Sequence, residues 1–183
     1  MTLAGWAAGA QLYQRTAASR ALEQYARSRG LVFAPAPSTP RGASPRVLGT
    51  RDGVAFVVDL YRLRGEVRTR VSASADRGRA PTLSVLQRGA FSFGTPSLRM
   101  GDTSFDRAFV VTRGAAEDAD ALRTVLKPAL LVENRCKGVW LRSDGQRVSL
   151  SWRGLHADPL AVDAARDIVL AVAGWHRAES PYR

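Results

Sequence analysis

Three tight-turn signals, each set between runs of strand-forming residues, constrain the fold of this chain more than any other feature. The turns are Arg51-Asp52-Gly53, a turn at Gly65, and Ser143-Asp144-Gly145-Gln146. The flanking runs are residues 46–50, 54–63, 66–75, 138–142 and 147–152. Short turns of this composition join antiparallel neighbours. The sequence therefore predicts a three-stranded antiparallel meander and a separate hairpin.

Segments with helical spacing of apolar residues lie around these strands. They are residues 3–29 before Gly30, residues 117–126 with a second short helix beginning at Pro128, and a last helix capped by Asp158 and opened by Pro159. The buried stripe expected for the last helix is Leu160, Ala164, Ile168, Ala171 and Trp175. This order predicts an α+β fold, a mostly antiparallel sheet with helices on one side and the N- and C-terminal helices flanking it.

The run 54–63 is apolar at both odd and even positions, with Asp59 as the exception before Arg62. Such a pattern is typical of a strand buried on both faces, so we expect it at the centre of the sheet. Residues 34–45 contain four of the nine prolines and are expected to form a surface loop. The chain is then one domain over residues 1–183, with an N-terminal helix (1–29), this loop, a strand-rich half (46–112) and a helix-hairpin-helix half (113–178).

The joint between these halves is the run from Gly101 to Val111. Gly101 and Asp102 open a turn, Asp102 is placed to cap the backbone that follows, and Phe105 and Phe109 share a face and are expected to be buried. Asp106 is expected at the surface. Asp102 and Asp106 could instead pair as general acid and base, but a cap and a surface carboxylate explain both.

This Gly-Asp-x-x-Phe-Asp-x-x-Phe-Val-Val run, the Asp52-Gly53 hairpin before residues 54–61 and the closing strand-strand-helix resemble an uncharacterised bacterial domain family. The likeness covers residues 21–175. It implies a bacterial domain, often preceded by a membrane-spanning helix in other members, with no assigned activity, cofactor or catalytic residue. The order of elements is also similar to that of small bacterial secretion-chaperone-like domains, a likeness of fold alone.

The net charge of +11 comes from 25 arginines and two lysines against 16 acidic residues. An arginine-rich, lysine-poor composition also follows from GC-rich coding, which weakens charge as a sign of an anionic partner. The distribution is informative: residues 1–90 hold 14 basic and 5 acidic side chains, and residues 91–183 hold 13 and 11. The excess lies in the first half.

Four arginines of the first half define the candidate binding site. If the turn is the three-residue loop Gly65-Glu66-Val67, alternation places all four on one sheet face. They are Arg62, Arg64, Arg68 and Arg70. They would converge on an anionic groove, a phosphate backbone or an acidic protein surface. The alternative is that Glu66 neutralises them or that their stems cover apolar sheet.

The sequence contains few residue patterns typical of a catalytic or metal-binding site. Cys136 is the single cysteine, which excludes an internal disulfide, and the histidines are His156 and His176, without metal-ligand spacing. Glycines do not follow a phosphate-loop pattern. We therefore predict a protein that is not an enzyme and has no cofactor and no metal.

The sequence thus predicts a non-enzymatic, cytoplasmic interaction or scaffold module that binds another protein. The alternative is a basic protein that binds nucleic acid or an anionic membrane surface. No transmembrane segment or secretory signal is expected. A peripheral contact with the inner membrane would use the N-terminal helix, where Leu3, Trp6, Ala10 and Tyr13 fall near one face.

Overall fold

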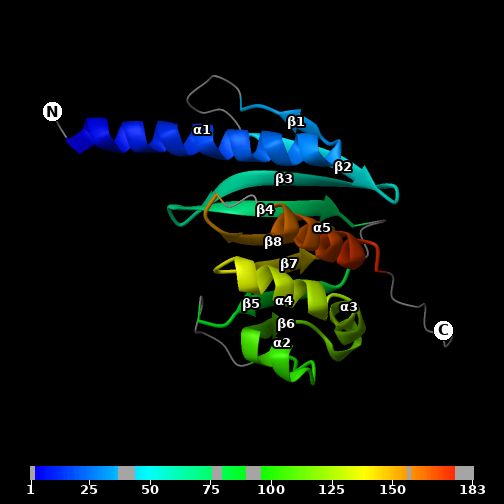
Figure 1. Ribbon diagram of the computed structural model, residues 1–183. Coiled ribbons are helices and arrows are strands. Elements are labelled where there is room, and N and C mark those ends of the chain that lie inside the picture. Colours follow the sequence, from blue (N-terminus) through cyan, green and yellow to red (C-terminus); the bar gives the residue numbers. More distant parts are fainter. Residues whose placement is uncertain (1–2, 37–43, 76–79, 90–95, 156–157, 176–183) are drawn as a thin grey trace.

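The computed structural model describes residues 3–36, 44–75, 80–89, 96–155 and 158–175 (Figure 1). Most of the loop expected over residues 34–45 lies outside these ranges. The elements are α1 (Leu3–Arg29), β1 (Val32–Ala34), β2 (Arg46–Arg51), β3 (Val54–Leu63), β4 (Glu66–Ser74), β5 (Thr82–Gln87), α2 (Thr103–Ala108), β6 (Phe109–Arg113), the 3-10 helix η2 (Ala116–Asp118), α3 (Ala119–Arg123), α4 (Leu126–Arg135), β7 (Trp140–Asp144), β8 (Arg147–Arg153) and α5 (Pro159–Ala173).

The strands form one eight-stranded antiparallel sheet in the order β1-β2-β3-β4-β8-β7-β5-β6. The α+β fold expected from the sequence is confirmed. The late hairpin β7–β8 lies between β4 and β5, so Thr69 pairs with Trp152 and Leu83 pairs with Ser143. Residues 46–112 and 113–178 therefore share one sheet.

The described α-helices, α1 to α5, lie on the same side of this sheet (Figure 1). Helix α5 packs across β4 and β8, and α4 packs beside α5. The core between the layers takes its side chains from every second strand position. One row crosses six strands as Val58, Val71, Leu150, Leu141, Val85 and Val111, and all six residues are buried. Within the described ranges, no helix combines the length and apolar character needed to cross a membrane.

The meander β2–β3–β4 has two-residue turns. Arg51 pairs with Val54, and Leu63 pairs with Glu66. Asp52 and Gly53 have φ of 51° and 80°, and Arg64 and Gly65 have φ of 50° and 84°. Positive φ at both central residues is the turn geometry whose twist matches that of adjacent strands. The three-residue loop expected at Gly65-Glu66-Val67 is therefore wrong.

Strand β3 is internal in the sheet, as expected, but only one of its faces lies under helices. Phe56, Val58 and Leu60 belong to the core, whereas Ala55 is exposed and Tyr61 is half-buried on the other face. Apolar composition at both alternating positions had predicted burial on both sides. Among the described residues, no helix or second sheet covers the other face of this strand.

The C-terminal helix α5 begins as the sequence predicts, because the Asp158 carboxylate accepts from the Leu160 N–H and Pro159 takes the first turn. The expected buried stripe is partly wrong: Leu160 and Ala171 are exposed. The buried surface is wider and consists mainly of small residues. It comprises Ala161, Val162, Ala164, Ala165, Ile168, Val169, Val172 and Ala173. Small side chains let the helix lie close to the sheet.

The helical segment between β6 and β7 divides differently from the sequence expectation of one helix over residues 117–126. It is split into η2 and α3, and α4 begins at Leu126, so Pro128 lies in the first turn of α4. A proline is tolerated there because the first-turn N–H groups have no partner within the helix.

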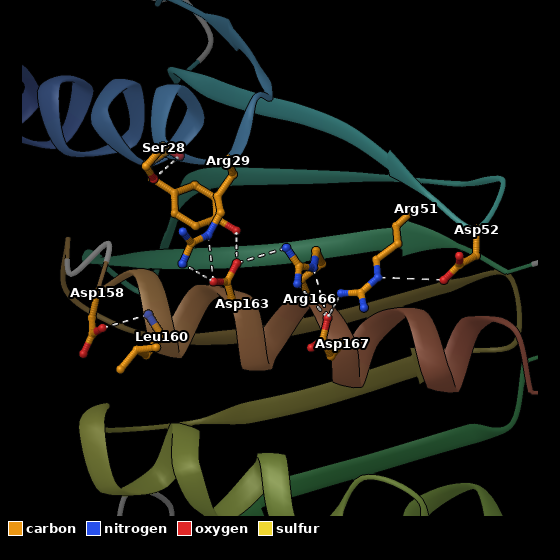
Figure 2. A network of polar contacts seen from close by, with 10 residues as sticks. Ser28, Arg29, Arg51, Asp52, Asp158, Leu160, Asp163, Arg166 and Asp167 are labelled. Carbon is orange, nitrogen blue, oxygen red and sulfur yellow. Dashed lines mark hydrogen bonds and ion pairs between the residues drawn. The ribbon is translucent and has the colours of Figure 1, made fainter.

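Helix α1 and the β2–β3 turn are tied to α5 by a chain of charged groups (Figure 2). The Asp163 carboxylate accepts from Tyr25 Oη at 2.9 Å, from Arg29 Nη2 at 2.6 Å and from Arg166 Nη1 at 3.0 Å. Asp167 in turn accepts from Arg166 and from Arg51 Nη1, at 2.7 Å for Arg51. Two carboxylates one turn apart on α5 thus hold α1 and the β2–β3 turn, and Arg166 of α5 itself bridges the two carboxylates.

The pKa of Asp163 reflects this position. Burial raises the pKa, but hydrogen bonds from Arg29 and Tyr25 and the charge of Arg166 outweigh burial and hold the pKa below its usual range. A carboxyl whose folded pKa is lowered adds stability above its unfolded pKa of about 3.9, and this stability is lost as pH falls through the folded pKa.

We expect Asp163→Asn to lower the free energy of unfolding at pH 7 by about 2 kcal/mol, because hydrogen bonds from charged donors are lost. At about pH 3 the loss should shrink, because the carboxyl of the unfolded chain, with a pKa of about 3.9, is then largely protonated and the folded state loses its advantage as pH falls further. Urea titrations at the two pH values measure this. Asp120→Asn is the matched control, since Asp120 pairs with Arg123 at an exposed site. Equal losses at both pH values would contradict the assignment.

Candidate functional site

The face of the sheet that points away from the helices is the candidate functional site, and we call it the open face (Figure 1). It carries the strand positions that alternate with the core row. One row on it crosses the sheet as Arg46, Asp59, Arg70, Ser151, Trp140 and Leu86. Serines occupy several of its remaining positions. They are Ser72, Ser74, Ser84 and Ser149.

Arginine dominates the charge of the open face. In the described strands β2, β3, β4, β5, β7 and β8, six arginines and three carboxylates alternate onto this face. The arginines are Arg46, Arg68, Arg70, Arg142, Arg147 and Arg153. The carboxylates are Asp59, Glu66 and Asp144. Hydrogen bonds from the Arg147 and Gln146 backbone N–H groups hold the pKa of Asp144 below its usual range. This carboxylate therefore stabilises the β7–β8 turn in which it lies.

A compact polar group forms where β3, β4 and β8 adjoin. Arg70 donates to both oxygens of Asp59, from Nε at 2.9 Å and from Nη2 at 2.6 Å. Its guanidinium carbon also lies 4.7 Å from the centre of the Tyr61 ring, and Tyr61 Oη donates to Ser151 Oγ at 3.0 Å. These contacts fix the directions of Arg70 and Tyr61, whose side chains are half-buried.

A second group lies on the adjoining strands β7, β8 and β5. The Arg142 guanidinium carbon is 5.9 Å from the Trp140 ring centre, and Trp140 Nε1 donates to Ser84 Oγ at 3.1 Å. Arg147 Nη2 donates to Ser72 Oγ at 2.9 Å. Arg142 and Arg147 are exposed. The open face thus combines exposed guanidiniums with half-buried aromatic rings, all on rigid strands.

The structure does not bring the four predicted arginines together on one face. Because the turn has two residues, Arg62 pairs with Val67 and lies on the helix side, and Arg64 belongs to the turn itself. Arg68 pairs with Tyr61 and Arg70 with Asp59 on the open face. Two of the four residues therefore share a face, and Arg68 is fully buried there.

Sequence reasoning did not find Arg46, Tyr61, Trp140, Arg142, Arg147 and Arg153 as members of the site. A signal for part of it was present, since β8 reads Arg-Val-Ser-Leu-Ser-Trp-Arg and β4 contains Arg-Thr-Arg-Val-Ser-Ala-Ser. Strict alternation of polar and apolar residues marks a strand with one face outside the core. The sequence did not predict the order of the strands, which places β4 and β8 side by side.

The motif at Gly101–Phe109 lies away from the open face and forms a local structural unit. Asp102 caps α2 by accepting from the Phe105 N–H at 2.8 Å, and the Phe105 and Phe109 rings are buried with centroids 5.0 Å apart. Asp106 was expected at the surface; it is half-buried and accepts from the Met100 and Gly101 N–H groups, both at 3.0 Å.

Both carboxylates of the motif therefore accept hydrogen bonds from backbone N–H groups. Burial raises the pKa of the Cys136 thiol to about 12. His156 and His176 lie outside the described residues. Among the residues that are described, no group of three or more His, Cys, Asp or Glu side chains is arranged to hold a metal ion.

The open face belongs to a fold that has been seen in a bacterial protein. The crystal structure of the mycobacterial trehalose monomycolate transport factor A, TtfA, superposes with a TM-score of 0.52 over 85% of this chain and 92% of that chain, at 14% sequence identity. This likeness establishes a shared fold. No family model matches the sequence. No curated protein matches it either.

We expect Phe109→Ala to lower the free energy of unfolding by about 3–5 kcal/mol, because a buried ring leaves a cavity. Loss of one cap in Asp102→Ala should cost about 1 kcal/mol. Urea titration measures both. Since the motif lies off the open face, neither change should alter ligand binding by the folded protein. A stable Phe109→Ala protein that has lost binding would show that the motif is itself a site.

We expect Cys136 to resist alkylation. At neutral pH a thiol with a pKa of about 12 is almost entirely protonated, and the thiolate is the reactive form. Iodoacetamide should therefore label the native protein far more slowly than the urea-unfolded protein, as followed by intact mass. Equal labelling rates would contradict the burial of this residue.

Proposed function

We propose that this chain is a non-enzymatic bacterial binding module and that its open face takes an acidic surface of another protein. The observation that carries the proposal is the charge and position of this face: on β2, β3, β4, β5, β7 and β8 it carries six arginines against three carboxylates, on the side of the sheet that points away from the helices (Figure 1). Complementary charge steers partners together and selects among them. A cytoplasmic site of action accompanies the proposal.

The residue types of the open face support a protein partner. Arginine, tyrosine and tryptophan contribute most often to binding energy at protein interfaces, whereas lysine is depleted there. The described strands that form this face carry no lysine. Arg70 and Arg147 are already held by Asp59 and Ser72, so less side-chain entropy is lost when they bind.

The alternative occupant, a nucleic acid, is less well supported. Single strands bind by stacking bases on open aromatic faces beside a basic groove. On this face the Tyr61 ring carries the guanidinium of Arg70, and the Trp140 ring lies against that of Arg142. Cation–π contacts of this kind use the ring surface that a base would need.

A binding role without catalysis is supported by the state of three side chains that catalysis could otherwise use. Asp102 and Asp106 accept backbone hydrogen bonds, and the Cys136 thiol is held in its protonated form. The structural neighbour TtfA is described as a transport factor. The state of the three side chains favours binding over turnover.

The test measures binding of a fluorescein-labelled oligoglutamate peptide by anisotropy over a series of salt concentrations. We expect binding at low salt that weakens as salt rises. Arg142→Gln/Arg147→Gln should bind about tenfold more weakly, because two exposed charge contacts together contribute about 1.4 kcal/mol. Arg107→Gln/Arg123→Gln is the matched control, with the same loss of charge on exposed residues of α2 and α3.

Two results would overturn the proposal. Equal weakening in both double variants would mean that net charge, and not the open face, determines binding. Tighter binding of an oligothymidine than of the peptide, with a steep salt dependence that the Arg142/Arg147 variant flattens, would assign the face to nucleic acid.

A further inference from the structure

We propose that Arg68 and Arg153 form a carboxylate-binding subsite on the open face, and that Glu66 occupies it until an acidic side chain of the partner displaces Glu66. This inference rests on the proposed function and names the chemistry at one point of that surface. The subsite lies at the N-terminal end of β4, beside the C-terminal end of β8 and the residues that precede β7.

Arg68 is the unusual group in this part of the molecule. Its side chain has no exposed surface. Nη2 donates to the Gly138 carbonyl, and it lies 3.5 Å from the Ser151 carbonyl. The two other nitrogens, Nε and Nη1, are buried and have no hydrogen-bond acceptor. Buried donors without acceptors are unfavourable, and a charged group more so.

Glu66 approaches these donors without satisfying them. Its Oε2 atom lies 3.9 Å from Arg68 Nη1, beyond hydrogen-bond distance, and 3.2 Å from Arg153 Nε. The one carboxylate oxygen thus lies between two guanidiniums. Both cations would accept a closer carboxylate, because hydrogen bonds between ionised groups are stronger and shorter than neutral ones.

The Glu66–Arg153 pair can be displaced by side-chain rotation. Both side chains are half-exposed, at 48% and 45% of their surface, and exposed ion pairs contribute little to stability. The Arg153 stem lies directly over Gly138, where an added Cβ would come within 2.8 Å of Arg153 Cγ. A side chain at residue 138 would therefore displace the Arg153 stem from its present position.

We expect the ligand of this subsite to be a carboxylate, because the Glu66 carboxylate already lies beside Arg68 and Arg153. Glu66 supplies an internal copy of the group that an acidic protein surface presents. Its removal should therefore increase affinity for an acidic peptide, whereas removal of an arginine should decrease it. A merely structural ion pair would give no gain when Glu66 is changed.

The experiment uses the oligoglutamate peptide at low salt. Glu66→Gln should bind about tenfold more tightly and Arg153→Gln about tenfold more weakly, a factor expected for one charge-assisted contact. Asp52→Asn is the control for Glu66→Gln, since it makes the same charge change at an exposed turn. Arg62→Gln controls for Arg153→Gln, because Arg62 is exposed on the helix side. Both controls should stay within about twofold of wild type.

A spectroscopic readout reports on Arg68 directly. In ¹⁵N-edited NMR spectra the Arg68 Nε–H signal, assigned by its loss in Arg68→Lys, should shift on addition of the peptide. The same shift should be absent in Arg153→Gln at equal peptide concentration. If Arg68→Lys does not fold, assignment through the backbone of the wild-type protein serves instead.

The outcomes separate this inference from the proposed function. If wild type binds and the Arg142/Arg147 variant weakens, but Glu66→Gln matches Asp52→Asn and Arg153→Gln matches Arg62→Gln, the subsite is wrong and the open face stands. If wild type binds no acidic peptide at low salt, both fall. Binding of inorganic phosphate with the same Arg68 shift but no response to the peptide would overturn the assignment to a protein carboxylate.

Discussion

Coverage of the sheet by helices on a single face is the constraint from which the other properties of this protein follow. Side chains alternate along a strand, so each strand must be apolar at one set of positions and tolerant of water at the other. Across six strands the inner set runs from Val58 to Val111 and is buried throughout. The outer set, one residue along, is rich in arginine and serine and includes the aromatic residues Tyr61 and Trp140. The same alternation of side chains along the strands therefore determines both the core and the candidate site.

Local signals predicted what local physics controls. The extent of α1, the hairpins, the cap at Asp158 and the cap at Asp102 are each fixed by a few adjacent residues, and each is present in the structure. The arginine cluster failed for an equally local reason. With two residues in the β3–β4 turn in place of three, Arg62 pairs with Val67 and leaves the face that holds Arg68 and Arg70. One residue in a turn thus decided the composition of the expected site.

Long-range pairing could not be predicted, and it determines most of the candidate site. Nothing in the sequence of β4 states that its neighbour is β8, yet this pairing brings Tyr61 to Ser151 and Arg68 to Gly138. The carboxylates of α5 were equally unreadable, because Asp163 looks like any polar residue on a helix until α1 packs beside it. Such contacts depend on the arrangement of elements and not on spacing along the chain.

The placement of the β7–β8 hairpin has a consequence for how the chain is made. During synthesis β3 and β4 leave the ribosome early, and β5 and β6 follow. The neighbour of β4 is β8 and the second neighbour of β5 is β7, and both are translated after β6. Until then, β4 and β5 both expose unpaired backbone edges, which favour association between chains. Joining the two parts requires contacts between distant residues, which are slow to form. A nascent chain that ends before residue 140 is thus an aggregation-prone intermediate, and late insertion of the hairpin completes the sheet.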